Sequence, residues 1–286
     1  MNRIKTTRVF LVAFGLLGIL FLITAFTSGS NEVQQRAFLY KVEFKKYINR
    51  PDITVTDYIQ VNTKGNTNFT FFYNRMKRDS IESLRKISSQ ERYTLFVKDH
   101  PYSIKTVKNK AIFTAEVGDQ YFSYEQTIDF KWKLTDTKRK IDSYNCKLAT
   151  VSYAGRTWNA WYTMDLPMDV GPYKFKGLPG CIVEMSDVDG IFKYTLIQTK
   201  RKDNLRFEHY ANVLKSPIIS TTREEFNKYQ QAYLSLSFDQ RMAYLVRGQA
   251  GIMTSEFKSQ DGQVDFKNKQ FDEMDDSPFI EIDHID

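Results

Sequence analysis

The sequence contains two cysteines, Cys146 and Cys181, and these side chains have the most distinctive chemistry in the chain. An even number of cysteines in an exported protein favours a disulfide bond. Such a bond would close a loop of about 35 residues and stabilise the fold by about 4 kcal/mol in the chain-entropy model. Two buried thiols and a two-cysteine metal site are the alternatives. Free-thiol labelling of the denatured, unreduced protein distinguishes the bonded from the free state.

Histidine is the next side chain suited to metal binding or base catalysis, and the chain has His100, His209 and His284. No two of them lie at the short spacing typical of zinc ligands. No Gly-x-Ser-x-Gly motif marks a nucleophile. The acidic residues 272–276 lack the alternating pattern and central glycine of a calcium loop. The sequence therefore predicts no catalytic residue, no metal site and no cofactor.

A third group of candidates is aromatic and basic, and it lies within 158–176. Its members are Trp158, Trp161, Tyr173, Lys174, Phe175 and Lys176. Aromatic rings can stack on a glycan, hold an acyl chain or fill a core. We expect the two lysines to be exposed. We predict that these six residues form a binding surface, with a packed core as the alternative for the aromatic rings.

Turn-forming residues surround these candidates and must position them. They are Gly171, Pro172, Gly177, Leu178, Pro179 and Gly180. Proline fixes φ at the first central position of a type II turn, and glycine accepts a positive φ at the second. Pro179-Gly180 therefore predicts a type II turn that brings Leu178 close to Cys181. Gly177 is a second permissive position.

The stretch GPYKFKGLPGCIVE (171–184) follows IDSYNCKLA (141–149) and GRTWNAWYT (155–163). These segments resemble the GLPGLI family of Bacteroidetes cell-envelope proteins, which is named for its Gly-Leu-Pro-Gly-Leu-Ile signature. The resemblance is close over 141–187 and loose elsewhere, and Cys181 stands where the signature has leucine. The resemblance implies an exported protein. The family is largely uncharacterised, so it implies no reaction and no catalytic residues.

The N-terminus carries an export signal. Arg3, Lys5 and Arg8 precede an apolar run at 9–26, and small residues follow. This order is typical of a signal peptide, but the run also reaches the length of a membrane-spanning helix, about 17–25 residues. Residues 1–30 are therefore either a cleaved signal peptide or an N-terminal anchor. In both cases we expect 31–286 outside the inner membrane, in the periplasm or beyond.

Charge is distributed unevenly along the chain. The net charge is +7, but residues 261–286 hold nine acidic and two basic side chains, which makes this tail −7. The body at 31–260 is therefore strongly basic, which favours contact with its own tail or with anionic envelope components. A soluble surface with a solvated tail is the alternative. Nucleic acid is excluded as a partner by the predicted export.

Aromatic and β-branched residues recur at regular spacing, and this pattern predicts an α+β fold dominated by one large, curved antiparallel sheet. Strands are expected at 37–47, 67–73, 92–97, 104–107, 111–117, 121–124, 127–134, 141–153, 156–164, 181–185, 191–199 and 205–210. Asp189-Gly190 predicts a hairpin between the strands on either side of it. The body at 31–260 is long enough for a single domain.

Helices are predicted at 80–88 and over 222–247, where the pattern allows one or two helices. Thr222 and Glu225 have the spacing of a capping box, and Phe226 and Tyr229 share one face. Residues 278–282 in the acidic tail have three interpretations: an added edge strand, a disordered segment or a peptide that binds a partner.

Together these patterns predict a binding or structural module of the cell envelope. Its partner would be an envelope protein, a glycan or a hydrophobic ligand, and it would touch the membrane only through 9–26 if the signal is not cleaved. The alternative is an envelope hydrolase whose active site the sequence does not identify.

Overall fold

The computed structural model describes residues 34–45, 52–73, 102–117, 120–208 and 217–237. The chain divides into two units, Met1–Gln34 and Gln35–Asp286, and every strand and helix given below belongs to the second. The predicted export signal at 1–30, the helix at 80–88, the strand at 92–97 and the acidic tail lie outside the described residues. No helix in the described ranges is both long and apolar enough to cross a membrane.

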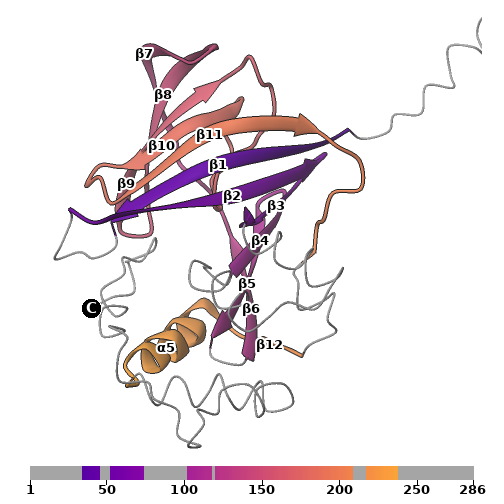
Figure 1. Ribbon diagram of the computed structural model, residues 1–286, viewed down its shortest axis with the longest axis vertical. Coiled ribbons are helices and arrows are strands. Elements are labelled where there is room, and N and C mark those ends of the chain that lie inside the picture. The colour runs from indigo at the N-terminus through magenta and orange to yellow at the C-terminus, as the bar shows by residue number, and fades with distance from the viewer. Residues whose placement is uncertain (1–33, 46–51, 74–101, 118–119, 209–216, 238–286) are drawn as a thin grey trace, which may run out of the picture. The chain divides into compact units, whose positions relative to one another are not determined.

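Twelve strands in the described ranges form one sheet, which confirms the predicted fold class (Figure 1). The strands are β1 (Gln35–Lys45), β2 (Thr54–Lys64), β3 (Thr67–Phe72), β4 (Tyr102–Val107), β5 (Lys110–Val117), β6 (Gln120–Thr127), β7 (Lys133–Ile141), β8 (Tyr144–Tyr153), β9 (Arg156–Thr163), β10 (Cys181–Asp187), β11 (Phe192–Arg201) and β12 (Ile218–Ser220). Their order in the sheet is β12-β6-β5-β4-β3-β2-β1-β11-β10-β9-β8-β7. Neighbours are antiparallel except β12, which pairs with β6 in parallel.

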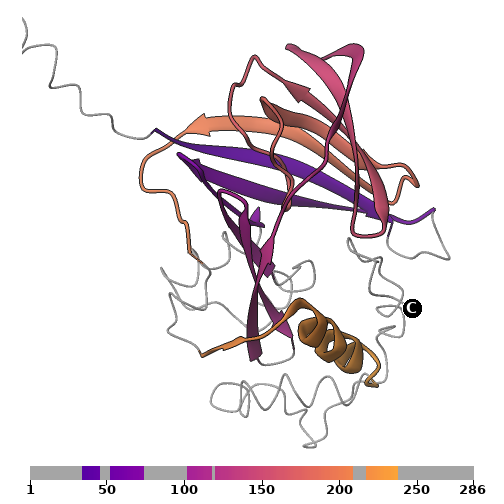
Figure 2. The same ribbon diagram turned by 180° about the vertical axis from the view of Figure 1, so that it is seen from behind.

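β1 covers most of the strand expected at 37–47, and its alternation of apolar and polar residues places the apolar face in the core. Phe38 and Tyr40 are fully buried, and Val42 and Phe44 are nearly so. β1 pairs with β2 on one side and with β11 on the other, so it joins the two halves of the sheet. The sheet twists along its length, as L-amino-acid strands do. β3–β6 consequently run steeply across the direction of β1, β2 and β11 (Figures 1 and 2).

The sequence prediction omits β2, β12 and most of β7, and two of the predicted strands differ from the structure. β2 was not expected, because Asp57, Gln60 and Asn62 interrupt its apolar pattern, although all three are buried. The strand expected at 127–134 is instead a non-strand connection at 128–132, which sends Ile128, Phe130 and Trp132 into or against the core. The start of the strand expected at 205–210 is irregular at 205–207.

Helix α5 (Arg223–Leu234) begins where the sequence predicts. The Thr222 side chain accepts a hydrogen bond from the backbone N–H of Glu225, and the Glu225 side chain accepts one from the backbone of Thr222. This capping box satisfies two N–H groups that a helix leaves open. Phe226 is buried, and Tyr229 packs on Phe122 of β6 with ring centroids 4.5 Å apart. The helix therefore covers the end of the sheet that contains β6 (Figure 2).

Candidate functional site

Residues 164–180 connect β9 to β10 and hold most of the sequence candidates; we call them the crossing loop. The backbone of the loop pairs with the start of β10, because Cys181 donates to the carbonyl of Leu166 and Ile182 donates to that of Val170. Its tight turn runs from Pro172 to Phe175, whose N–H donates to the carbonyl of Pro172 over 3.1 Å. Tyr173 takes a φ of +57° in this turn, a strained value for a residue with a Cβ.

The aromatic rings of the crossing loop lie in the core. Phe175 is 1 % exposed, and its ring centroid lies 4.9 Å from Trp158 and 5.2 Å from Phe130. Tyr173 is 5 % exposed and meets Tyr102 of β4 edge to face at 5.9 Å. The rings of Phe175 and Tyr173 therefore do not form an exposed binding surface in this structure. They join the β8–β9 part of the sheet to the β3–β6 part.

Lys174 is also buried, so the expectation that it is exposed is wrong. Its side chain is 1 % exposed. Its Nζ donates to the side-chain oxygen of Gln126 over 3.0 Å and to the Tyr124 hydroxyl over 3.3 Å. The rings of Phe113, Tyr124 and Tyr173 lie 5.2–5.3 Å from the amine, within the range of cation–π attraction. The amine is thus held between β5, β6 and the loop.

Polar contacts fix the crossing loop to other elements. Thr70 of β3 donates to the carbonyl of Tyr173 over 3.1 Å, and Asn68 donates to that of Asp169 over 3.0 Å. Trp132 donates to the carbonyl of Lys176 over 2.8 Å. Lys176 is less buried than Lys174 and pairs with the Asp169 carboxylate at 3.6 Å. The loop therefore has few backbone groups left for a ligand, since its neighbours already satisfy several of them.

The glycines of the crossing loop do not form the predicted type II turn. Gly180 does not have a positive φ, so a type II turn at Pro179-Gly180 is wrong; the left-handed glycine of this region is Gly177, at +91°. A Cβ on Gly171 would lie 2.5 Å from the carbonyl oxygen of Phe175. Gly171 and Gly180 are therefore needed for close approach of backbone segments rather than for their φ angles.

Cys146 and Cys181 are both free and buried, which corrects the predicted disulfide. Both residues pair in register with Thr163, Cys146 from β8 and Cys181 from β10. Two strand spacings separate their backbones by about 10 Å, beyond the roughly 7 Å that a disulfide can span between Cα atoms. Burial raises the pKa of the Cys146 thiol to about 11 and that of Cys181 to about 12.

A buried ion pair lies at the other end of β9 and β10. Arg156 Nη1 is 3.0 Å from Asp187 Oδ2, and the two side chains are 5 % and 0 % exposed. The backbone N–H of Phe192 also donates to Asp187. The hydroxyl of Tyr194, whose pKa is raised by burial and by the charge of Asp187, has no hydrogen-bond partner in the described part of the chain. The fold therefore buries Arg156 and pairs it with a carboxylate.

Trp161 differs from the other aromatic candidates because it is only partly buried. The guanidinium of Arg139 lies 4.2 Å from its ring centroid and also contacts the Glu184 carboxylate at 2.5 Å. Lys193 reaches the same carboxylate at 3.3 Å. Burial by itself raises the pKa of Glu184, but hydrogen bonds and charge from Arg139 and Lys193 outweigh it and lower the pKa. Trp161 thus lies in a charged cluster on β7, β9, β10 and β11.

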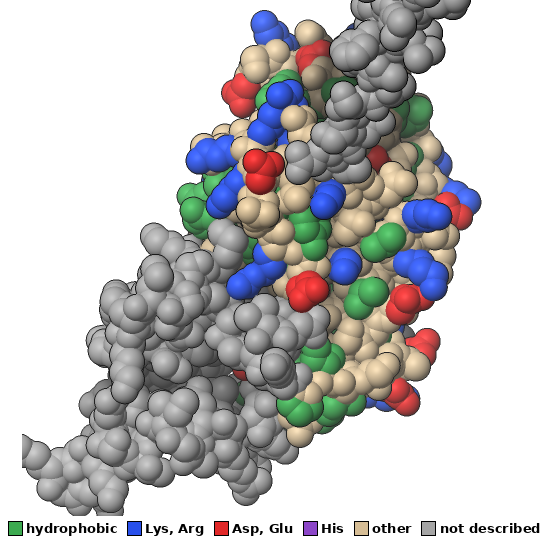
Figure 3. Space-filling model, turned by 90° about the vertical axis from the view of Figure 1, so that its right-hand side faces the viewer, with side chains coloured by type: hydrophobic (Ala, Val, Ile, Leu, Met, Phe, Trp, Pro, Cys, Tyr) green, Lys and Arg blue, Asp and Glu red, His purple; other side chains and the backbone are tan. Residues whose placement is uncertain are grey.

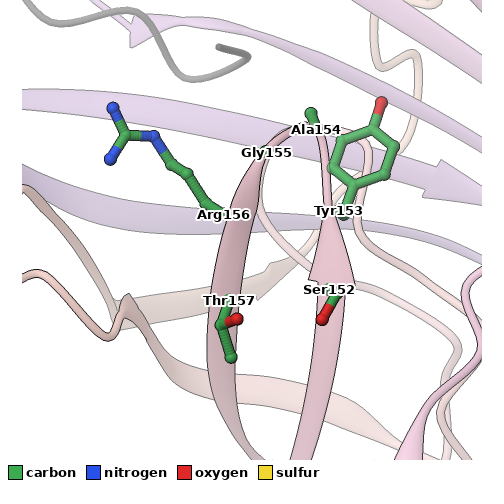
Figure 4. A pocket seen from close by; sticks show the side chains of 6 residues that line it. All are labelled: Ser152, Tyr153, Ala154, Gly155, Arg156 and Thr157. Atoms are coloured by element: carbon green, nitrogen blue, oxygen red, sulfur yellow. The ribbon is translucent and has the colours of Figure 1, made fainter. Parts of the chain in front are cut away.

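The β8–β9 hairpin forms a shallow pocket that sequence analysis did not identify (Figure 4). Its volume is about 380 Å³, and the residues that line it are Ser152, Tyr153, Ala154, Gly155, Arg156 and Thr157. Figure 4 shows the hydroxyls of Ser152 and Thr157 on adjacent strands, while the Tyr153 and Arg156 side chains extend to opposite sides. The signal in the sequence is Ala154-Gly155 between two strands, a tight-turn pattern.

No cluster of three metal-binding side chains occurs among the residues that the structure describes. All three histidines lie outside those residues. On the face in Figure 3, acidic and basic side chains are interspersed with separate apolar ones.

A family model described as a protein of unknown function, Porph_ging, matches residues 151–184. The matched stretch contains β9, the crossing loop and the hairpin pocket. The matched name is not that of the GLPGLI family which the sequence resembles, and its description assigns no function. No curated protein matches the chain.

Two solved structures of PNGF-II resemble the chain. The structure in the C2 space group has a TM-score of 0.50 and 16 % identity and covers 70 % of this chain; the one in P21 has a TM-score of 0.51, with the same identity and coverage. At this identity the likeness concerns the fold alone. The chain spans about a third of the PNGF-II chains, 33 % and 34 %. An uncharacterized conserved protein from Thermus thermophilus matches at 9 % identity and a TM-score of 0.34, over 67 % of this chain and 93 % of its own.

Proposed function

We propose that this chain is an exported cell-envelope protein that binds a glycan, or a similar polyhydroxylated molecule, at the β8–β9 hairpin. The observation that carries the proposal is the shallow pocket at this hairpin, where the Ser152 and Thr157 side chains are exposed on adjacent strands. The pocket is shallow and open, which suits a ligand that lies along the surface of the hairpin. The pocket also lies inside the stretch 151–184 that the family model matches.

The exposed hydroxyls of the hairpin suit a sugar. Serine and threonine hydroxyls donate and accept hydrogen bonds, as sugar hydroxyls do, whereas the Tyr153 ring packs inward on Phe130 and Phe175. Ala154 and Gly155 have φ values of +53° and +78°, which are typical of a two-residue hairpin turn. Because the turn fixes the two strands, Ser152 and Thr157 are held opposite each other before a ligand arrives, and this lowers the entropy cost of binding.

The packing of the crossing loop supports a rigid binding module more than a carrier of hydrophobic molecules. A carrier needs a closed apolar cavity, but here Phe175 and Trp158 fill the space beside the sheet with their own rings. Trp158, Tyr173, Lys174 and Phe175 are buried, so they could meet a ligand only if the loop moved. Ligand contacts by Trp161 and Lys176 stay predictions. An envelope hydrolase also stays a prediction.

Binding can be tested with oligosaccharides released from the envelope of the producing cell. We expect them to shift the backbone NMR signals of 152–157, and we expect a Ser152→Ala, Thr157→Val double variant to bind about tenfold more weakly, since two hydrogen bonds of about 0.7 kcal/mol each are lost. Thr199→Ala on β11 is the matched control. Unchanged affinity in the double variant would contradict the proposal.

Export is supported by the basic and apolar pattern of 1–30. Cell fractionation followed by native mass spectrometry tests it. We expect the protein in the envelope fraction, and the mass shows whether 1–30 has been removed. Recovery in the cytoplasmic fraction would contradict export.

A further inference from the structure

We propose that residues 278–282, a mostly apolar segment of the chain's own acidic C-terminal tail, add to the sheet as a strand along the open edge of β7. The proposal rests on the edge geometry of β7 and on its charge, and it is independent of the pocket at the β8–β9 hairpin.

β7 is the last strand of the sheet order and pairs only with β8 among the described residues. Most of its side chains are exposed. The strand at the opposite end, β12, has only three residues, which leaves little backbone for a further strand. β7 has nine residues, and its pairing with β8 is regular from Lys138 to Ile141 after a register shift between Leu134 and Lys138. This regular part offers a row of N–H and C=O groups to an extended segment.

The charge of β7 indicates what kind of segment it accepts. The strand carries four basic side chains and one acidic one; Arg139 already pairs with Glu184, which leaves Lys133, Lys138 and Lys140 beside Asp136. Lys138 lies directly opposite Lys147 of β8, and like charges at such a position destabilise the pair. Lysines on an edge discourage indiscriminate strand pairing. An acidic segment would relieve this repulsion instead of adding to it.

The tail matches this edge in charge and in pattern. Residues 261–286 have a net charge of −7, and the sequence at 278–282 is PFIEI, with acidic residues on both sides. Its apolar residues would cover Leu134, which is 58 % exposed on β7. Residues 238–277 join the tail to the described part and could span about 130 Å if extended, so the segment can reach the edge without a change in the sheet.

Hydrogen exchange of the full chain against a chain that ends at Gln260 tests the pairing. We expect the β7 amides to exchange at least about tenfold more slowly in the full chain, and a synthetic peptide of 272–286 to restore this protection to the short chain. Equal exchange in the two chains would overturn the proposal. Protection of the full chain that rises with protein concentration would also overturn it, because it would show pairing between copies.

Charge reversal supplies an independent check in the full chain. Lys138→Glu with Lys140→Glu should remove the β7 protection, whereas Lys200→Glu with Lys202→Glu, the same charge change on β11 and just beyond it, should leave it intact. Raised ionic strength should weaken the protection, because exposed charges are screened. If the β7 amides lost their protection in the Lys200→Glu, Lys202→Glu variant but kept it in the Lys138→Glu, Lys140→Glu variant, a site at β7 would be refuted.

Discussion

Gly180 lies so close to Thr163 that a Cβ atom added to the glycine would be 2.0 Å from the carbonyl oxygen of Thr163. The contact joins the end of the crossing loop to the end of β9. A backbone carbonyl in a strand cannot rotate away as a flexible side chain can, so a substitution must separate the two segments. The contact explains why glycine stands at position 180 although its φ is not left-handed.

We therefore expect Gly180→Ala to lower the free energy of unfolding by about 3 kcal/mol, at the upper end of what overpacking costs. The control is Gly190→Ala, where nothing lies within 4 Å of the new Cβ but φ is +69°. Its cost should be only about 1 kcal/mol, from the left-handed backbone. Thermal unfolding followed by circular dichroism measures both, and similar melting temperatures for the two variants would contradict the contact.

Lys174→Met should destabilise the protein by about 2 kcal/mol. The substitution keeps the volume but removes the amine that donates to Gln126 and Tyr124, and buried acceptors without a donor cost about 1–3 kcal/mol. Lys176→Met is the matched control in the same loop. Its ion pair with Asp169 is long and partly exposed, so its loss should cost less than about 0.5 kcal/mol. Urea unfolding of both variants measures the difference. A larger loss of stability in Lys176→Met than in Lys174→Met would contradict the buried position of the Lys174 amine.

Both cysteines should resist alkylation in the native protein at about pH 8. Their thiols are buried, with pKa values of about 11 and 12, so few thiolates are present. After denaturation without a reductant, mass spectrometry should find iodoacetamide on both Cys146 and Cys181. A denatured protein that takes up no label would show that the cysteines are bridged after all.

Glu184 should contribute to stability at neutral pH and lose that contribution in acid. Its pKa in the folded protein lies below the ordinary value of 4.5, so the stabilisation is present above pH 4.5 and is lost as the pH falls through the folded-state pKa. Glu184→Gln should therefore cost about 1 kcal/mol at neutral pH, and the difference from the parent should shrink as the pH falls below 4.5. Urea titrations at several pH values measure it; a difference that grows in acid would contradict the assignment.

Local patterns in the sequence were sufficient for the elements that depend on neighbours along the chain. The alternation of Phe38, Tyr40 and Val42 predicted β1 and its buried face. The Thr222 and Glu225 pair predicted the start of α5, and Asp189-Gly190 predicted the β10–β11 hairpin. In each case the deciding interactions join residues only a few positions apart, so they can be recognised without knowing the fold.

Tertiary structure decided the features that depend on distant segments. Lys174 is buried because β5 and β6 bring aromatic rings around it, and a lysine between aromatic residues gives no sign of this in the sequence. Cys146 and Cys181 remain thiols because β9 separates their strands, although their number alone favours a bond. Gly180 is required by a carbonyl on another strand rather than by its own φ. Sequence spacing could not determine these contacts, because the strand order of the sheet sets which residues meet.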